Sequence, residues 1–431
     1  TTTGEESEET EETPDTRTAM SVAIDDEGSS GKIYFNKVLV DAVDAYNPSE
    51  GVFTVPSDGV YLISLSGAAA EESTLHFRLK QDGMSAFQAA VPGADPEVPV
   101  TLRRDSVAHS GTDTMGRSAM VRYTEGTRLY VESLAAGFDS DGELQTSWSM
   151  FSITDTMRSD VFFFVTRHSS WEEVGERVLF DQDYLIPDGD IYNDEDDIFT
   201  CPLTGIYFFS FTTGVVGEQT VQLQLHVGDR IFEIRRTADN HNGIDTLSRS
   251  VLVNCEDGEE VYITLEEGSL YSDGDSNLLS FMGFLYQPAE VSPVAFAAYR
   301  VTMLTSDSED YDIVNFYGDD VDDEYTEPNM GNAFDGTYFT CPQNGTYYVY
   351  IGAGAEDFER LNYNLRLNGG TLIDVFRGHS SHTGLDTLGR GIILYLSEGD
   401  TLHIELAYST LYADSTLHAT FFGFLIYSDQ E

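Results

Sequence analysis

Apolar and polar residues alternate along many short stretches of the chain. Residues 221–227 read Val-Gln-Leu-Gln-Leu-His-Val, and residues 361–367 read Leu-Asn-Tyr-Asn-Leu-Arg-Leu. A period of two turns one face of an extended strand toward a core and the other toward solvent. Glycine-rich turns separate such stretches, and no long stretch has the helical period of 3.6. The pattern predicts an all-β protein built from antiparallel sandwiches of short strands.

Two segments occur three times each, in the same order. The first has the form Phe-Thr-x-Pro-x-x-Gly-x-Tyr, which reads as strand, proline turn and strand. The second has the form His-x-Gly-x-Asp-Thr-x-x-Arg, and five of its nine positions are identical in all copies. This repetition predicts three tandem copies of one domain. The first segment starts at Phe53, Phe199 and Phe339, and the second starts at His109, His241 and His382.

The repeat spacing predicts where the domains begin and end. We expect domain 1 at residues 19–157, domain 2 at 158–288 and domain 3 at 289–431. Residues 1–18 form an acidic tail rich in Glu, Ser and Thr. This tail has too little apolar surface to build a core, so it is expected to be disordered.

Charge narrows the function. The 431 residues include 22 Lys and Arg against 75 Asp and Glu, a formal net charge of −53 at pH 7. This excess excludes nucleic-acid binding and docking on anionic membranes, both of which need basic surfaces. No segment has the roughly 20 consecutive apolar residues of a membrane helix. An acidic surface tolerates salt and divalent cations, which favours a secreted, extracellular protein. Because the sequence starts at Thr1 without a signal-like apolar region, we expect a processed chain.

Each copy resembles the complement C1q globular-head domain, a ten-stranded jelly roll of the tumour-necrosis-factor type. The resemblance rests on the Phe-Thr-x-Pro-x-x-Gly-x-Tyr segment and on Pro293–Ala298, which is similar to the opening strand of that family. Phe281–Leu285 and Phe421–Leu425 are similar to the closing strand of that family, and Gly399-Asp400 is similar to one of its late turns. The first copy departs at its end, where residues 148–152 read Trp-Ser-Met-Phe-Ser. The implied fold is three tandem C1q/TNF-like jelly rolls.

The resemblance also implies assembly around a three-fold axis, because domains of this family usually form trimers. The chain has no Gly-x-x run, so it contains no collagen stalk. We expect an intramolecular pseudo-trimer, since linkage raises the effective concentration of neighbouring copies to roughly the millimolar range. Short linkers leave another arrangement open, in which the copies self-associate with other C1q-domain chains and form a polymer.

The aspartates of the second repeated segment are candidate metal ligands. In several members of the family the equivalent aspartate lies near the trimer apex and ligates calcium. The resemblance therefore implies a calcium site at Asp113, Asp245 and Asp386. Calcium takes roughly six to eight oxygen ligands, which carboxylates, carbonyls and water can supply. Neighbouring acidic loops resemble another apex loop of the family and add the candidate ligands Asp273, Asp275 and Asp414.

An arginine ends each of these segments, at Arg117, Arg249 and Arg390. Residues four apart on a strand share a face, so each arginine can neutralise the preceding aspartate through a charge-assisted pair. Arginine and calcium are therefore rival counter-ions for the same carboxylates. The histidines that begin the segments either form hydrogen bonds in the glycine turn or gather into a zinc-binding or pH-sensitive cluster. These histidines are His109, His241 and His382.

The cysteines and one asparagine add covalent candidates. By the resemblance, Cys201 and Cys255 lie on antiparallel neighbouring strands, so a disulfide between them is expected. Leu396 stands where Cys341 would need its partner, and Cys341 is either a buried thiol or an intermolecular cross-link. Asn344 opens an Asn-Gly-Thr glycosylation sequence in an exposed turn.

No catalytic motif is present: the chain has no nucleophile elbow, no His-Glu-x-x-His and no phosphate-binding glycine loop. We expect a secreted, non-enzymatic C1q-domain protein that serves as an acidic structural or extracellular-matrix component with calcium-dependent assembly. The alternative is a lectin-like protein of innate immunity that binds glycans or microbial surfaces, as many invertebrate members of the family do.

Overall fold

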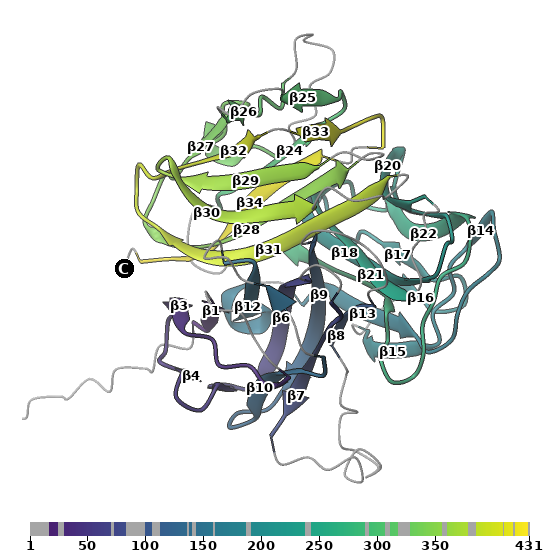
Figure 1. The fold of residues 1–431 in the computed structure, drawn as a ribbon, viewed down its shortest axis with the longest axis horizontal. Coiled ribbons are helices and arrows are strands. Elements are labelled where there is room, and N and C mark those ends of the chain that lie inside the picture. The colour runs from purple at the N-terminus through teal and green to yellow at the C-terminus, as the bar shows by residue number, and fades with distance from the viewer. Residues whose placement is uncertain are drawn as a thin grey trace, which may run out of the picture.

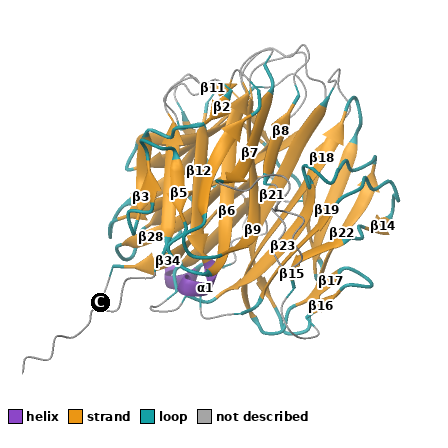
Figure 2. Cartoon of the chain, turned by 90° about the horizontal axis from the view of Figure 1, so that it is seen from below, coloured by secondary structure: helices purple, strands orange, loops and turns teal. Residues whose placement is uncertain are grey.

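The chain folds into three β-sandwiches that surround a common axis (Figure 1). Nearly all of the regular structure is strand, and the helix α1 (Ile153–Thr156) is a single turn (Figure 2). Among the described residues, no helix is long and apolar enough to cross a membrane. The predicted all-β fold is confirmed. The computed structural model describes residues 17–24, 30–69, 73–82, 100–105, 113–135, 138–139, 144–157, 160–186, 191–237, 243–288, 293–306, 311–317, 328–355, 360–377, 385–407, 409–416 and 419–429.

Strands β1 to β12 build the first sandwich, β13 to β23 the second and β24 to β34 the third. The first comprises β1 Ala19–Ile24, β2 Gly31–Lys32, β3 Lys37–Asp41, β4 Tyr46–Asn47, β5 Val52–Thr54, β6 Gly59–Ala69, β7 Leu75–Gln81, β8 Thr101–Arg104, β9 Asp113–Tyr123, β10 Arg128–Ser133, β11 Phe138–Asp139 and β12 Thr146–Ser152. The second comprises β13 Phe162–Arg167, β14 Glu176–Arg177, β15 Gln182–Leu185, β16 Tyr192–Asn193, β17 Ile198–Thr200, β18 Gly205–Val216, β19 Val221–Val227, β20 Arg230–Arg236, β21 Ile244–Cys255, β22 Glu260–Glu267 and β23 Leu279–Tyr286. The third comprises β24 Ala295–Arg300, β25 Leu304–Ser306, β26 Asp312–Ile313, the 3-10 turn η3 Met330–Asn332, β27 Tyr338–Thr340, β28 Gly345–Ala355, β29 Leu361–Leu367, β30 Gly370–Arg377, β31 Asp386–Leu396, β32 Thr401–Leu406, β33 Ser409–Tyr412 and β34 Ala419–Ser428.

Each sandwich has an outer sheet and an inner sheet that differ in burial. In the outer sheet, β19 alternates between buried and half-buried residues, as its period of two predicts. In the inner sheet, β6 and β28 are buried along their whole length. A strand is buried on both faces when a second layer covers each face. The outer sheet of the same sandwich covers one face, and the inner sheets of the other two sandwiches cover the other.

Every outer sheet continues into the inner sheet of the next sandwich. Strand β8 of the first sandwich pairs with β21 of the second, β20 of the second pairs with β31 of the third, and β30 of the third pairs with β9 of the first. The cycle closes within one chain, so the three sandwiches form an intramolecular pseudo-trimer. The pairs at these junctions are Arg104↔Asp245, Arg236↔Asp386 and Arg377↔Asp113.

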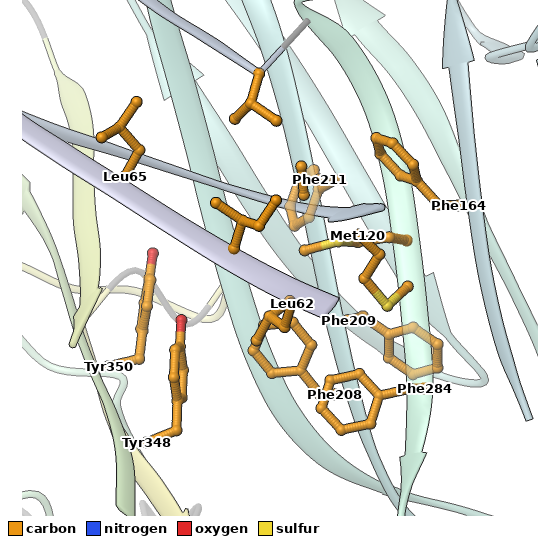
Figure 3. Close-up of a cluster of buried hydrophobic side chains, with 14 of the residues drawn as sticks. Leu62, Leu65, Met120, Phe164, Phe208, Phe209, Phe211, Phe284, Tyr348 and Tyr350 are labelled. Atoms are coloured by element: carbon orange, nitrogen blue, oxygen red, sulfur yellow. The ribbon is translucent and has the colours of Figure 1, made fainter. Parts of the chain in front are cut away.

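Apolar side chains of all three sandwiches pack together in one buried cluster, with Leu62 and Met120 of the first, Phe208 and Phe284 of the second and Tyr348 of the third (Figure 3). The Phe208 ring lies 5.7 Å from Tyr348, edge to face, and 6.2 Å from Phe424. Phe151 of the first sandwich lies 6.2 Å from Phe424 and 6.4 Å from Phe284. Large rings in such offset and edge contacts dominate the energetics of an interface. We name these five aromatic residues the axial aromatic cluster.

The unusual closing strand of the first copy keeps its structural place. Strand β12 pairs with β1 and β6, as a closing strand must. Trp148 is fully buried, and the rings of Phe35, Tyr46 and Phe53 lie 6.2–6.3 Å from it. The larger indole therefore fills the core of the first sandwich.

The first and last described segments of the chain lie side by side. Arg17 Nη1 donates a hydrogen bond to the Ser428 carbonyl oxygen at 3.1 Å. The Arg17 guanidinium also lies 5.6 Å from the centre of the Tyr427 ring. The start of the first sandwich thus contacts the end of the third.

Candidate functional site: an aspartate–arginine ring on the pseudo-threefold axis

The structure brings the three repeated aspartates together. Asp113 and Asp386 begin β9 and β31, and Asp245 is the second residue of β21. These three strands pack against one another around the axis. All three aspartates line one small cavity of about 30 Å³. That volume holds about one water molecule.

Arginines that end the neighbouring outer strands reach the same cavity. Arg104 forms an ion pair with Asp113 through Nη1, and its Nε lies 3.9 Å from Asp245 Oδ1. Arg236 Nη1 lies 3.3 Å from Asp245 Oδ2. The side chains of Arg104 and Arg236 are only 5% and 2% exposed. We call these two arginines and the three aspartates the axial ring.

Burial sets the ionisation of the axial ring. Burial raises the pKa of Asp245 to about 6, and Arg236 and Arg104 offset this only in part. For Arg104, burial lowers the pKa, but Asp113, Asp245 and Asp386 together raise it above its ordinary value. Asp113 has the direct contact with Arg104, so Asp245 receives less compensation for its burial.

The axial ring does not fit a calcium ion. Calcium requires about six to eight oxygens at roughly 2.3–2.6 Å from one centre. Here guanidinium nitrogens contact the carboxylates instead. In the part of the chain that the structure describes, no group of three or more His, Cys, Asp or Glu side chains is arranged to hold a metal. The other candidate ligands, Asp273, Asp275 and Asp414, do not line the axial cavity.

Arg117, Arg249 and Arg390 do not pair with the preceding aspartates, contrary to the prediction from the four-residue spacing. Arg117 donates to the Thr101 carbonyl oxygen at 2.8 Å and to the Ser276 carbonyl oxygen of the second sandwich at 3.2 Å. Asp113 already has Arg104 as its counter-ion. Arg117 instead donates to buried carbonyl oxygens, which would otherwise lack a hydrogen-bond donor. We call these three residues the bridging arginines.

The bridging arginines link the sandwiches in a cycle. Arg117 donates to a late loop of the second sandwich, Arg249 to a late loop of the third, and Arg390 to a late loop of the first. All three side chains are fully buried, and burial lowers the pKa of each to about 10. Besides Arg117, Arg249 donates to the carbonyls of Glu233 and Thr416 and to Thr420 Oγ1, and Arg390 donates to the carbonyls of Asp374 and Leu144 and to Ser147 Oγ.

Asp273 and Asp414 order the loops that the bridging arginines hold. Asp273 Oδ1 accepts the Ser276 backbone N–H at 2.7 Å, and Asp414 Oδ1 accepts the Thr416 backbone N–H at 2.8 Å. In each loop the other carboxylate oxygen accepts a tyrosine hydroxyl two residues earlier in the chain. Asp275 is exposed, and its backbone N–H donates to Asp273. These carboxylates fix the turn that presents carbonyls to the next sandwich.

Other positions of the repeated segment also join the sandwiches. Thr246 Oγ1 accepts the Arg103 backbone N–H and donates to the Arg103 carbonyl oxygen, both at 2.9 Å. Thr387 makes the same pair of bonds with Arg235, at 3.0 and 3.2 Å. At Gly116, an added Cβ would lie 2.6 Å from a carbonyl oxygen of the third sandwich. The repeated aspartate, threonine, small residue and arginine therefore all serve contacts between domains.

The expected disulfide between Cys201 and Cys255 is absent. Both are buried free thiols. Cys255 stands opposite Gly205 in the β18–β21 register rather than opposite Cys201. A hydrogen bond to Cys201, together with burial, raises the pKa of the Cys255 thiol. Cys341 is a buried thiol whose Sγ donates to the Gln343 carbonyl oxygen at 3.1 Å, which agrees with one of its two predicted states.

Two further predictions remain open. Asn344 is exposed in the turn between β27 and β28, and its glycosylation stays a prediction. Its Oδ1 accepts the Glu398 backbone N–H at 2.7 Å. The histidines of the repeated segment, His109, His241 and His382, lie outside the described residues.

The arginines of the junctions have a sequence signal that the two repeated segments do not contain. Arg104, Arg236 and Arg377 each lie nine residues before the aspartate of their own copy (113 − 104, 245 − 236 and 386 − 377). The four residues that follow each arginine differ among the copies, so the spacing becomes visible only when the repeated segments are aligned. The outer strands β8, β20 and β30 end at these arginines.

Comparison with known proteins agrees with this architecture. The family model for the C1q domain matches residues 18–152, 162–286 and 295–426. Among solved structures, the globular domain of zebrafish complement 1qA protein has 22% identity over 32% of this chain and 97% of its own, with a TM-score of 0.25. A triple jelly-roll protein of an archaeal virus has 9% identity over 92% of this chain and 91% of its own, with a TM-score of 0.18. TM-scores this low add nothing to the family match. On that match, which covers most of its length, the chain belongs to the C1q-domain family and contains three C1q domains in tandem.

Proposed function

We propose that this protein is a secreted, non-enzymatic, acidic component of an extracellular structure, in which one chain supplies a complete three-domain C1q head. The observation that carries the proposal is the closed cycle of sheets, in which each domain uses its inner sheet against the other two domains. Such a head needs no second chain to complete its trimer contacts. It therefore meets other molecules through its outer surface.

That outer surface is the acidic part of the molecule. Several of the few cations are buried between domains, among them the bridging arginines and the arginines of the axial ring. Most carboxylates of the described residues remain at least partly exposed. Particles with a formal charge of −53 repel one another at low ionic strength. Millimolar calcium or high salt screens this repulsion, and calcium can bridge exposed carboxylates of adjacent particles.

Sedimentation velocity of the full chain tests this proposal. In a chelator at low salt, we expect a single species of 47.7 kDa. Addition of millimolar calcium should produce reversible, concentration-dependent association, and sodium chloride at equal ionic strength should produce less. A mass that stays at one chain across all calcium and salt conditions would contradict a structural role based on cation-dependent association.

A groove on the second domain favours a second candidate function, the lectin-like recognition of glycans. The groove has a volume of about 600 Å³, which lies in the usual range for ligand sites. Trp171 and Tyr262 line it beside Arg177, whose guanidinium lies 4.6 Å from the centre of the Tyr262 ring. Aromatic faces with planar charged groups suit the apolar faces and hydroxyls of a sugar. Acidic side chains complete the lining, namely Glu173, Glu176, Glu195 and Asp196.

A glycan array read with the unmodified chain and with Trp171→Ala separates the two candidates. Recognition through the groove predicts hits that weaken at least about tenfold in the variant, the loss expected for one aromatic stacking contact of about 1.4 kcal/mol. The matched control is Tyr395→Ala, which removes an exposed aromatic ring of the third domain. Hits that survive Trp171→Ala, or an array without hits, would contradict glycan binding in the groove.

A further inference from the structure

We infer that arginine side chains are the cations of the axial ring, in the place of a divalent metal, and that the three domains close around the axis without calcium. This inference concerns contacts within one chain. It goes beyond the proposed function, which concerns contacts between particles.

The first support is the geometry of Arg104. It is the last residue of β8, and its backbone pairs with Asp245 of the second domain. From this junction its guanidinium contacts Asp113 of its own domain and lies 3.9 Å from Asp245. One cation thus links carboxylates of two domains, which is the task that an axial metal ion would perform.

The second support is the repetition of the arrangement around the axis. The register sets an arginine opposite an aspartate at each of the three junctions between domains. Arg236 supplies a second guanidinium to Asp245, at 3.3 Å. The same residue types at the same spacing in every copy indicate a built feature rather than one chance ion pair.

The third support is the set of atoms around the cavity, which lacks the number of hard oxygens that a metal needs. The cavity that the axial ring lines measures about 30 Å³. Calcium would need about six to eight oxygens around this small space, whereas guanidinium nitrogens already contact the carboxylates that line it. A guanidinium is planar, always charged and weakly hydrated, so it is the cation best suited to a buried site with little water.

Arg104→Ala provides the decisive test, because it removes the central cation and leaves the carboxylates in a larger cavity. Thermal unfolding is followed in a chelator and in millimolar calcium. The unmodified chain should show the same Tm in both, within about 1 °C, after the effect of equal ionic strength is subtracted. The variant should have a lower Tm in the chelator, and calcium should raise it by about 5 °C or more as the metal takes the vacated position.

The matched control is Arg128→Ala in the same domain. Arg128 is 44% exposed and pairs with Glu50 and Asp82 on the surface. Arg128→Ala removes one positive charge but changes no residue of the axial ring. Calcium should therefore raise the Tm of this variant no more than that of the unmodified chain. A calcium response equal to that of Arg104→Ala would mean that net charge, and not the axial ring, governs the effect.

The unmodified chain also provides a test that does not depend on the folding of Arg104→Ala. Crystals soaked in terbium, a calcium substitute, should show no anomalous peak among Asp113, Asp245 and Asp386. An axial peak, or a calcium-dependent Tm rise that Asp245→Asn abolishes, would overturn the inference. Neither result bears on association between particles, so sedimentation can fail while this inference stands, and the reverse also holds.

Discussion

At the scale of single residues, buried arginines link the domains. Arg117, Arg249 and Arg390 each donate to a carbonyl oxygen of their own sandwich and to one in a loop of the next. Each therefore satisfies carbonyl oxygens that would otherwise be buried without a donor. A planar group with five donors suits this task, and a lysine with its single ammonium does not.

Replacement of one bridging arginine should destabilise the whole chain. For Arg117→Met, which keeps the length of the side chain, we expect the free energy of unfolding to fall by about 2–4 kcal/mol, because several buried carbonyls lose their donor. Chemical denaturation measures the loss. Arg122→Met is the matched control, since Arg122 is exposed on the same strand, and its effect should stay within about 0.5 kcal/mol. Equal effects of the two substitutions would contradict a linking role for Arg117.

Asp245 predicts a dependence of stability on pH. Its pKa is raised from 3.8 to about 6 in the folded chain, so the folded state holds this proton more tightly than the unfolded state. Its contribution to stability is therefore complete below pH 3.8 and is lost as the pH rises through 6. The loss amounts to about 3 kcal/mol, from a shift of about 2.2 at 1.36 kcal/mol for each pKa unit.

Asp245→Asn isolates this contribution. The free energy of unfolding of the variant, minus that of the unmodified chain, should increase between pH 4 and pH 7 by about 3 kcal/mol. At pH 4 the folded chain holds Asp245 protonated, so the starting value of this difference contains no lost ion pair with Arg104 or Arg236. Asp275→Asn, at an exposed position, is the control for the loss of one carboxylate from the surface. A flat difference for Asp245→Asn would refute the raised pKa.

At the scale of elements, the junctions between strands explain why one sequence segment is repeated so faithfully. Strands β9, β21 and β31 carry the segment and pack against one another around the axis. Close packing requires a small residue, and Gly116, Ser248 and Gly389 occupy this position in the three copies. Ser248 Oγ also donates a hydrogen bond to the Gly116 carbonyl oxygen.

A methyl group at Gly116 should therefore push two domains apart. The added Cβ would lie 2.6 Å from the Gly389 carbonyl oxygen and 3.1 Å from the backbone of Arg390, neither of which can rotate away. We expect Gly116→Ala to lower the free energy of unfolding by about 1–3 kcal/mol, measured by chemical denaturation. Gly274→Ala is the control, because nothing lies within 4 Å of a Cβ at that position. A Gly116→Ala chain as stable as this control would show that the strands are less closely packed than described.

The elements were predictable from sequence, and the contacts between them were predictable only in part. The period of two at 221–227 predicts β19, because alternation reports directly on which face is buried. The convergence of the three repeated aspartates was implied by the resemblance to the C1q family, in which the equivalent residue lies near the trimer apex, and the residues alone do not predict it. Of the two counter-ions left open for Asp113, the arginine named from the spacing along one strand was Arg117, whereas the neighbouring strand supplies Arg104. Cys201 and Cys255 illustrate the same limit, because proximity of two strands does not determine the register of their side chains.

At the scale of the whole molecule, the first and second domains share one core that also includes the axial rings of the third domain, and the rest of the third domain's interior forms a second core. The axial aromatic cluster combines rings of all three domains, and one continuous set of buried apolar residues joins it to the interiors of the first and second domains. Domains joined in this way are expected to lose structure together, because unfolding of one exposes the apolar faces of the other two.

Phe208→Ala tests this cooperativity. Phe208 belongs to the second domain and is fully buried against Tyr348 and Phe424 of the third. We expect a loss of about 3–5 kcal/mol and one unfolding transition, with hydrogen-exchange protection reduced in the central strands of all three domains at once. Leu203→Ala, at a side chain that is 52% exposed, should leave protection unchanged. Loss of protection confined to the second domain would mean that the domains unfold independently.

The contact of Arg17 with Ser428 has a consequence for the order in which the domains are connected. Because the first and last described segments touch, a short peptide can join them, and new termini can then be opened at the seam between the second and third domains. Such a circular permutant should rebuild the same particle, since each domain keeps both of its neighbours. The order in which the chain connects the domains then matters less than the cyclic order of the surfaces through which they contact one another. A fourth copy added in tandem would find no free position around the axis, because each of the three domains already contacts the other two.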